Sequence, residues 1–491
     1  MPKEEIKSSR IIQLLRTLTE KEFRDFVVFV RSPWFNRNER LVHLAEFLYD
    51  IRNDFDTHFP DRRKVYAILY GEDAVFQEQQ VYDHFSFLTR LLENFFVQRT
   101  LDENPEEYQR LLLNSFSAKN LENQFDRLYR RKVKEWDKHP FGGTDYFLTK
   151  YRIQQEAVML FGQQQKRETD RHLPDLFSSL DIAYLSARLR FTCEWLNRAN
   201  IVQTEPGDSV LAPLRAFLDA VPAHFLEIPS VNGYYLVFLI LTAESPGENY
   251  PKLVHLLKQS SAHIPREEVN ELYAHAQNFC IKMINQGQAE YQAHLFGLFQ
   301  DLMDQNLLIE NGHLDHRKYK NIITVGLRME AFDWVWKFLF EYRDHLSTEY
   351  RENAFTYNLA AYHYERRQYH QALPLLNQVN FTDVYYHLSA KAMMLKIYFE
   401  MEEDLALESL LDTFRIFLDR NRTISAYQRT VHKNLIRFTR KAHRLRNEQI
   451  SMSRESLEES VHSLVQEILS VREVANINWL VKMVKDICEN D

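Results

Sequence analysis

The sequence predicts an all-α protein, organised largely as an α-solenoid in which helical hairpins follow one another along the chain. Glycine and proline, which punctuate β-rich folds, number only 11 and 14 in 491 residues. A hairpin-sized pattern recurs between about Arg266 and Arg420, and such a period is the signature of stacked helical repeats. The chain also exceeds the length at which a single hydrophobic core keeps growing. A stack of helices satisfies all three observations.

Residues 1–103 are expected to form a five-helix domain. Thr19 and Glu22 have the spacing of a capping box, in which each side chain bonds the backbone N–H of the other residue, and Asn36 with Glu39 suggests a second box. Gly71 should end a short helix, and a long helix with one apolar face follows it.

Residues 104–265 keep helical spacing, and we expect divergent hairpins there. Residues 266–420 carry the recognisable repeats. Residues 421–491 should form the helices that cap the stack, because an end repeat must turn a polar face outward. The last two helices are expected at 454–470 and 476–487.

The repeat is clearest where the segment from Asn321 to Leu339 overlays the segment from Asn358 to Leu376, 37 residues later and without a gap. A copy also begins at Asn278, with a glycine at 287 in the turn between its helices, and another begins at 394. Each of these two copies needs a shift of about two residues.

The unit that begins at Asn358 carries Leu359, Ala360 and Ala361 on its first helix, an aromatic at 369 before the second helix, and an alanine at 372 where the helices touch. In these features it is similar to the tetratricopeptide repeat. Small residues at a helix crossing let the axes approach. The unit departs from that repeat in three ways: its usual glycine is replaced by Ala360 and, one unit earlier, by Ile323; its closing proline is absent; and its period exceeds the usual 34.

Four short stretches, at 32–36, 278–287, 332–335 and 407–418, resemble an uncharacterised family of large bacterial helical-repeat proteins. The resemblance implies a helical-repeat fold and carries no activity with it.

The inner surface of the repeats is the first candidate site. In the tetratricopeptide register, the first-helix positions that face the concave groove are Gln277, Ile281 and Ile284, then Arg317, Lys320, Thr324 and Arg328, then Tyr357, Ala361 and Tyr364. A groove of this composition suits an extended acidic peptide or a partner helix. The alternative is that other parts of the chain fill the groove.

A basic segment from Arg420 to Arg446, which contains no Asp or Glu, is the second candidate site. One helix face within it should carry, at intervals of four residues, Arg429, Lys433, Arg437 and Lys441. Such a stripe can pair with nucleic-acid phosphates. The alternatives are a solvated face and one paired with acidic clusters of the same chain at 402–404 and 455–459.

No enzymatic signature occurs: the chain lacks HExxH, both Gly-rich phosphate loops and GxSxG. The nearest approach to a metal cluster is the His-Leu-Asp-His run at 313–316. We therefore expect no catalytic residue, cofactor or metal site.

Composition limits the classes of partner and the cellular compartment that we expect for the protein. The net charge of -8 argues against a molecule that coats nucleic acid over its whole surface, and three scattered cysteines give no disulfide framework. No segment reads as a secretory signal or is long enough to span a membrane, so we expect a soluble, cytoplasmic protein. The predicted function is non-catalytic binding of a protein or peptide partner, as a scaffold or adaptor. The alternative is nucleic-acid-linked regulation through the helix at 420–446.

Overall fold

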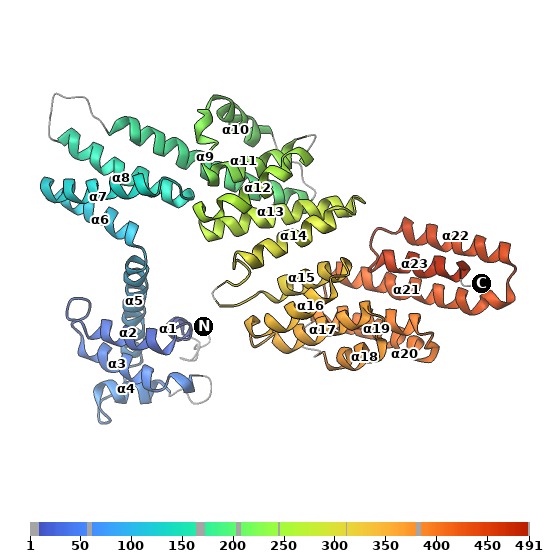
Figure 1. Cartoon of the computed structure of the whole chain (residues 1–491). Coiled ribbons are helices and arrows are strands. Elements are labelled where there is room, and N and C mark those ends of the chain that lie inside the picture. The colour runs from blue at the N-terminus through green and yellow to red at the C-terminus, as the bar shows by residue number, and fades with distance from the viewer. Residues whose placement is uncertain are drawn as a thin grey trace. The chain divides into compact units, whose positions relative to one another are not determined.

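The computed structural model describes residues 9–55, 61–163, 172–202, 208–243, 246–310, 312–379 and 384–489. Within them the chain forms 23 α-helices and no β-strand, and the helices pack in sequential pairs (Figure 1). The predicted all-α fold class is therefore confirmed. The chain divides into two compact units, Met1–Arg188 and Leu189–Asp491, which are described separately.

The first unit contains eight complete helices among its described residues and the start of a ninth. They are α1 (Arg10–Leu15), α2 (Glu20–Arg31), α3 (Glu39–Asp50), α4 (Arg62–Tyr70), α5 (Glu78–Asp102), α6 (Pro105–Ala118), α7 (Glu122–Lys138) and α8 (Thr144–Gln163). The boundary between the units lies within α9 (Leu173–Val202). The finer domain limits expected at 103, 265 and 420 remain predictions.

Helices α1 to α5 share one hydrophobic cluster, to which the long α5 contributes residues along most of its length. The predicted capping box at the start of α2 is present: Glu22 N–H donates to Thr19 Oγ1 at 3.3 Å, and Thr19 N–H donates to Glu22 Oε2 at 2.6 Å. The second predicted box is wrong. Asn38, not Asn36, caps α3 by accepting from Arg40 N–H, because Asn36 bonds the backbone of the preceding turn instead.

Helices α6, α7 and α8 form a second cluster in the same unit. The inner face of α7 is apolar and includes Phe125, Leu128 and Trp136. It also contains Lys132, whose side chain is almost fully enclosed and whose ammonium bonds Glu106 at 2.6 Å and Glu135 at 3.0 Å. A buried charge needs such partners. The bond to Glu106 therefore holds the inner face of α7 against α6.

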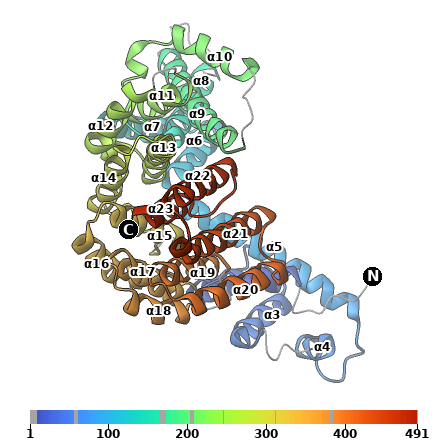
Figure 2. The same cartoon turned by 90° about the vertical axis from the view of Figure 1, so that its right-hand side faces the viewer.

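The second unit continues α9 with fourteen further helices among the residues described. They are α10 (Asp208–Ala220), α11 (Pro229–Thr242), α12 (Tyr250–Ser260), α13 (Arg266–Asn285), α14 (Tyr291–Asp304), α15 (His316–Arg328), α16 (Phe332–Glu341), α17 (Arg351–Glu365), α18 (Tyr369–Gln378), α19 (Val384–Glu400), α20 (Asp404–Arg420), α21 (Ala426–Glu448), α22 (Arg454–Ser470) and α23 (Ile477–Glu489). From α11 onward each helix packs against the next one in sequence (Figures 1 and 2).

The same turn joins the two helices of four successive hairpins, α13/α14, α15/α16, α17/α18 and α19/α20. One residue in each turn has a positive φ angle: Gly287 at 92°, Glu330 at 54°, Arg367 at 57° and Glu402 at 58°. The residue after it donates its N–H to the carbonyl five positions back, at 2.8 to 3.0 Å. This is the Schellman ending of an α-helix. The same ending follows α6 at Asn120 and α14 at Asn306.

Gly326 lies where α15 crosses α16. A Cβ atom there would stand 2.6 Å from Val335 Cγ2, which is too close for any real contact. Ala360 and Ala372, at the crossing of α17 and α18, are fully buried. Small residues therefore set the close approach of the paired helices.

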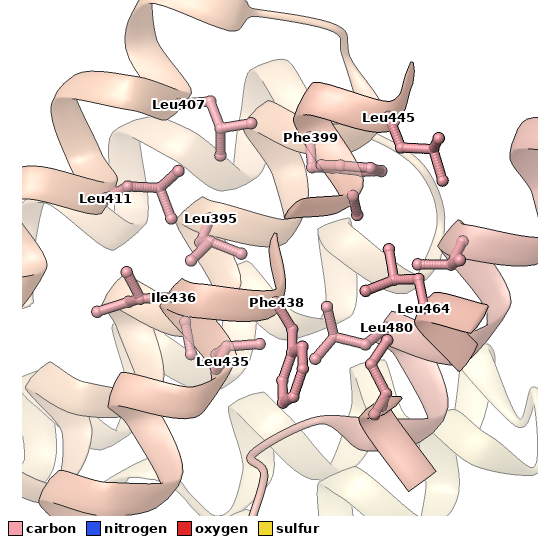
Figure 3. Packing of buried hydrophobic residues seen from close by; sticks show 14 of the residues in the cluster. Leu395, Phe399, Leu407, Leu411, Leu435, Ile436, Phe438, Leu445, Leu464 and Leu480 are labelled. Atoms are coloured by element: carbon pink, nitrogen blue, oxygen red, sulfur yellow. The ribbon is translucent and has the colours of Figure 1, made fainter. Parts of the chain in front are cut away.

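One continuous hydrophobic core of the second unit joins its last five helices. Leu395 and Phe399 of α19 meet Leu411 of α20, while Leu464 of α22 and Leu480 of α23 complete the cluster around α21 (Figure 3). The two terminal helices predicted from the sequence are present as α22 and α23. No described helix of either unit has the length and apolar character needed to cross a lipid bilayer.

Candidate binding groove

A groove with a volume of about 890 Å³ lies between α13 and α15, with α14 contributing apolar side chains. Its polar lining from α13 comprises Arg266, Glu267, Asn270, Glu271, Gln277, Asn278 and Asn285, and from α15 comprises Arg317, Lys318, Asn321, Thr324 and Arg328. The segment between α14 and α15 adds Glu310 and Asp315. All of these residues belong to the second unit. The groove is therefore a feature of one compact body.

Helical spacing explains how the lining arises. On α13 the residues at 270, 274, 277, 281 and 284 recur at intervals of three and four and form one stripe. On α15 the stripe is Arg317, Asn321, Thr324 and Arg328. Asp315 begins α15 by accepting hydrogen bonds from the N–H groups of residues 317 and 318, each at 2.9 Å. The cap fixes where the first turn, and with it Arg317, begins.

The groove is rich in side-chain amides. Gln277 is notable because its Nε2 is enclosed by protein and has no hydrogen-bond partner among the described residues. A buried donor left unpaired costs about 1–3 kcal/mol. Ile281, 44% exposed, offers an apolar surface beside it. A ligand side chain could cover the isoleucine, whereas a ligand carbonyl reaches the enclosed Nε2 only if the surrounding side chains move.

Two cations flank the amides on α15. The guanidinium of Arg317 makes no hydrogen bond or ion pair within the described chain, while Arg328 is in electrostatic contact with Glu365 of α17. On α13, by contrast, Glu271 is already neutralised: Arg190 donates to it at 2.8 and 2.5 Å, and Tyr234 donates at 2.7 Å. Although burial acts to raise the pKa of Glu271, these hydrogen bonds lower it overall. The lining also contains Glu267, Glu310 and Asp315, so the groove is mixed in charge. Its positive groups on α15 are Arg317, Arg328 and Lys318, and Lys318 lies 3.8 Å from Glu310.

The predicted inner-surface residues divide into two groups. Arg317, Thr324 and Arg328 line the groove, together with the predicted α13 positions at 277, 281 and 284. Lys320 does not line it: its ammonium donates to Ser389 Oγ at 2.8 Å and lies 4.7 Å from the ring centre of Tyr357. The predicted positions on α17 belong to this second, inward-facing group.

Of the second group, Tyr364 belongs to a cluster around Glu400 at the end of α19. Its carboxylate accepts hydrogen bonds from the hydroxyls of Tyr364 and Tyr369 and, at 2.7 Å, from the indole N–H of Trp479 on α23. Lys396 lies 4.3 Å from the ring centre of Tyr364, and burial lowers the pKa of its ammonium. These residues are satisfied by one another. They form a structural polar cluster that ties α23 to the repeats.

The basic stripe of α21 is also engaged within the chain. Arg429 donates to backbone carbonyls at the end of α20, the closest being Leu418 O at 2.5 Å. Lys433 pairs with Asp419 at 2.6 Å. Arg437 and Lys441 both pair with Glu467 of α22. The hydrogen bond from Lys441 and the one from Lys433 lower the pKa values of the carboxyls that accept them. The stripe therefore serves to dock α21 on its neighbours.

The 313–316 segment has structural contacts of its own. Leu314 N–H donates to His345 O at 2.8 Å, and the ring of His316 stacks on Tyr350 with 4.1 Å between centroids. In the parts of the chain that the structure describes, no group of three or more His, Cys, Asp or Glu side chains could hold a metal ion.

Sequence reasoning missed the amides Asn270, Asn285 and Asn321. The signal was present, because each of them shares a helix face with a predicted groove residue. Side-chain amides contribute neither to a charge pattern nor to hydrophobic periodicity, so composition alone does not identify them as groove residues.

Comparison of the chain with models of known protein families, with curated proteins and with solved structures finds no match.

Proposed function

We propose that the chain is a non-catalytic scaffold or adaptor that binds an extended, acidic segment of a partner protein in the groove between α13 and α15. The observation that carries the proposal is a groove lined by the side-chain amides of Gln277, Asn285 and Asn321, with Arg317 and Arg328 at the two ends of its α15 stripe. A side-chain amide both donates and accepts, and so matches the peptide group whatever the sequence of the ligand.

The arginines set the expected spacing of acidic residues in the ligand. Arg317 and Arg328 are 11 positions apart on α15, which corresponds to about 16 Å at about 1.5 Å per residue. An extended peptide covers that distance in about five residues at about 3.3 Å each. Two carboxylates separated by about five residues would therefore face the two guanidinium groups.

The proposal includes the tetratricopeptide-like solenoid expected from the sequence. Four hairpins with the same Schellman turn support it, as do the small residues at the crossings of α15 with α16 and of α17 with α18. In such an array the first helix of each hairpin lines a common inner surface, and α13 and α15 are the first helices of two neighbouring hairpins.

The experiment selects peptides from a random display library on the full-length protein and measures their affinities by fluorescence anisotropy. The selected peptides should carry pairs of acidic residues about five positions apart. The double variant Arg317→Ala, Arg328→Ala should weaken them at least tenfold, or about 1.4 kcal/mol. Gln277→Ala should also weaken them, because it removes the amide donor.

The matched control removes two exposed arginines outside the groove, with Arg420→Ala and Arg444→Ala. It should leave the affinities within about twofold. Equal affinities for the parent and both groove variants would refute the groove as the binding site.

A further inference from the structure

A second charged surface lies in the first unit, on the outer face of α7. Helical geometry, with about 100° per residue, puts Arg127, Arg130, Arg131, Lys134 and Lys138 on the side opposite the buried Phe125, Leu128 and Trp136. We call these five residues the α7 basic face. Asn123 lies on the same side, and the acidic residues of the helix, such as Asp126, Glu135 and Asp137, lie toward its flanks.

The charges of the α7 basic face are available, unlike those of α21. All five side chains are exposed. Arg130, with a side chain 79% exposed, is 3.8 Å from Asp126, which is a loose surface pair. Arg127, Arg131, Lys134 and Lys138 make no hydrogen bond or ion pair within the described chain. Asn123, Asp126 and the basic residues from 127 to 134 surround a hollow of about 450 Å³.

We propose that the α7 basic face binds the phosphate backbone of double-stranded nucleic acid. Charge complementarity identifies a polyanion: five exposed cations lie within 12 consecutive residues, from 127 to 138, or about 17 Å of helix. Duplex DNA presents about one phosphate charge per 1.7 Å of its axis. The net charge of -8 does not oppose this, because a local field is set by the side chains that face the ligand.

The composition of the face selects the duplex over other polyanions. No exposed aromatic residue interrupts the basic residues, so the platform on which single-stranded bases stack is missing. A helix that lies on a membrane needs a free apolar face, and the apolar face of α7 is buried in the α6–α8 core. The anchors of protein interfaces are enriched in Trp and Tyr as well as Arg, and the face has arginines but no exposed aromatic residue. Contact with phosphates alone predicts binding that is independent of base sequence.

The test measures binding of the full-length protein to a labelled DNA duplex of about 20 base pairs, by anisotropy, over a series of salt concentrations. The parent should bind with a steep salt dependence. The variant Arg127→Glu, Arg131→Glu, Lys134→Glu should bind at least tenfold more weakly. Its slope of log affinity against log salt should be smaller by about 2 to 3, because each phosphate contact contributes about 0.9. The variant Arg127→Lys, Arg131→Lys, Lys134→Arg keeps the charge and should bind within about twofold of the parent.

The control reverses three exposed arginines of the other basic segment, with Arg420→Glu, Arg422→Glu and Arg444→Glu, and so makes the same change in net charge. It should bind DNA within about twofold of the parent. Circular dichroism melting establishes that every variant is folded. An equal loss in the control, an unchanged affinity in the α7 variant, or preferential binding of anionic phospholipid vesicles or polyglutamate over DNA would overturn the proposal.

Discussion

At the scale of single residues, burial and pairing decide which charged groups act on a ligand and which hold the fold. His387 of α19 is buried against Phe417, with 4.4 Å between ring centroids. Burial, helped by the nearby Lys391, lowers the pKa of its imidazole to about 4 from an ordinary value of 6.5. In the unfolded chain the same ring binds a proton at the higher pH.

This pKa shift predicts a pH-dependent stability of the second unit. Above pH 6.5 His387 does not lower the free energy of unfolding. Between pH 6.5 and about 4 that free energy falls as the pH drops, because the unfolded chain binds a proton that the folded chain excludes. His387→Gln should reduce this loss, as measured by urea unfolding at a series of pH values. The reduction is partial, because burial also lowers the pKa values of His275 and His432.

The exposed His370 on α18 provides the control. His370→Gln should leave the pH profile unchanged. A profile for His387→Gln that coincides with that of the parent would contradict the assignment.

Only part of the candidate site could be predicted at this scale. The helical period put Arg317, Thr324 and Arg328 on one face, and the structure brings them together in the groove. Lys320 shares that period, but its long side chain turns to Ser389, 69 residues away in sequence. A contact of this kind depends on tertiary packing, which spacing along one helix does not contain. The same is true of Tyr364, whose partner Glu400 lies on another helix.

At the scale of helices, the turns within hairpins contain backbone strain that a substitution can remove. Glu330, Arg367 and Glu402 adopt the left-handed conformation, which costs a residue with a Cβ atom about 1–2 kcal/mol. Replacing each by glycine should stabilise the protein by about 0.5–1 kcal/mol, since glycine removes the strain but adds entropy to the unfolded chain. Thermal melting of the triple variant is the measurement.

The reverse substitution supplies the control, because Gly287 occupies the equivalent turn with φ of 92°. Gly287→Ala should lower the melting temperature. If the triple glycine variant melts at or below the temperature of the parent, the turns are not strained.

These turns also show where helix prediction succeeded and where it lacked a signal. Gly287 marked its turn in the sequence, because glycine tolerates a positive φ angle. The three equivalent turns carry Glu or Arg, so the sequence indicated their positions only through the alignment of the repeat copies. The ends of α22 were predicted from apolar spacing, and the structure adds the cap, Ser453, whose side chain accepts from Ser456 N–H. The Asn36 prediction failed because two asparagines precede α3 and spacing did not distinguish them.

At the scale of the whole molecule, the two units have separate hydrophobic cores. Leu88 is fully buried in the cluster of α1 to α5, and Leu480 is fully buried in the cluster of α19 to α23. We expect calorimetry to show more than one unfolding transition. Each of Leu88→Ala and Leu480→Ala should remove about 2–5 kcal/mol and shift a different transition. A common shift of all transitions by either variant would mean that the units unfold together.

The constant turn within hairpins has a consequence for how such a chain can change during evolution. Three residues separate the helices of each of the pairs α15/α16, α17/α18 and α19/α20, while the connection from α14 to α15 has 11 residues and that from α16 to α17 has nine. The turns within these hairpins therefore have a constant length, whereas the connections between hairpins vary in length. Insertions in the connections between hairpins would change the tilt of one hairpin against the next without altering the turns within hairpins. The inner surface could then be refitted to a new partner by changes in the connections, although the one from α14 to α15 also contributes Glu310 and Asp315 to the groove.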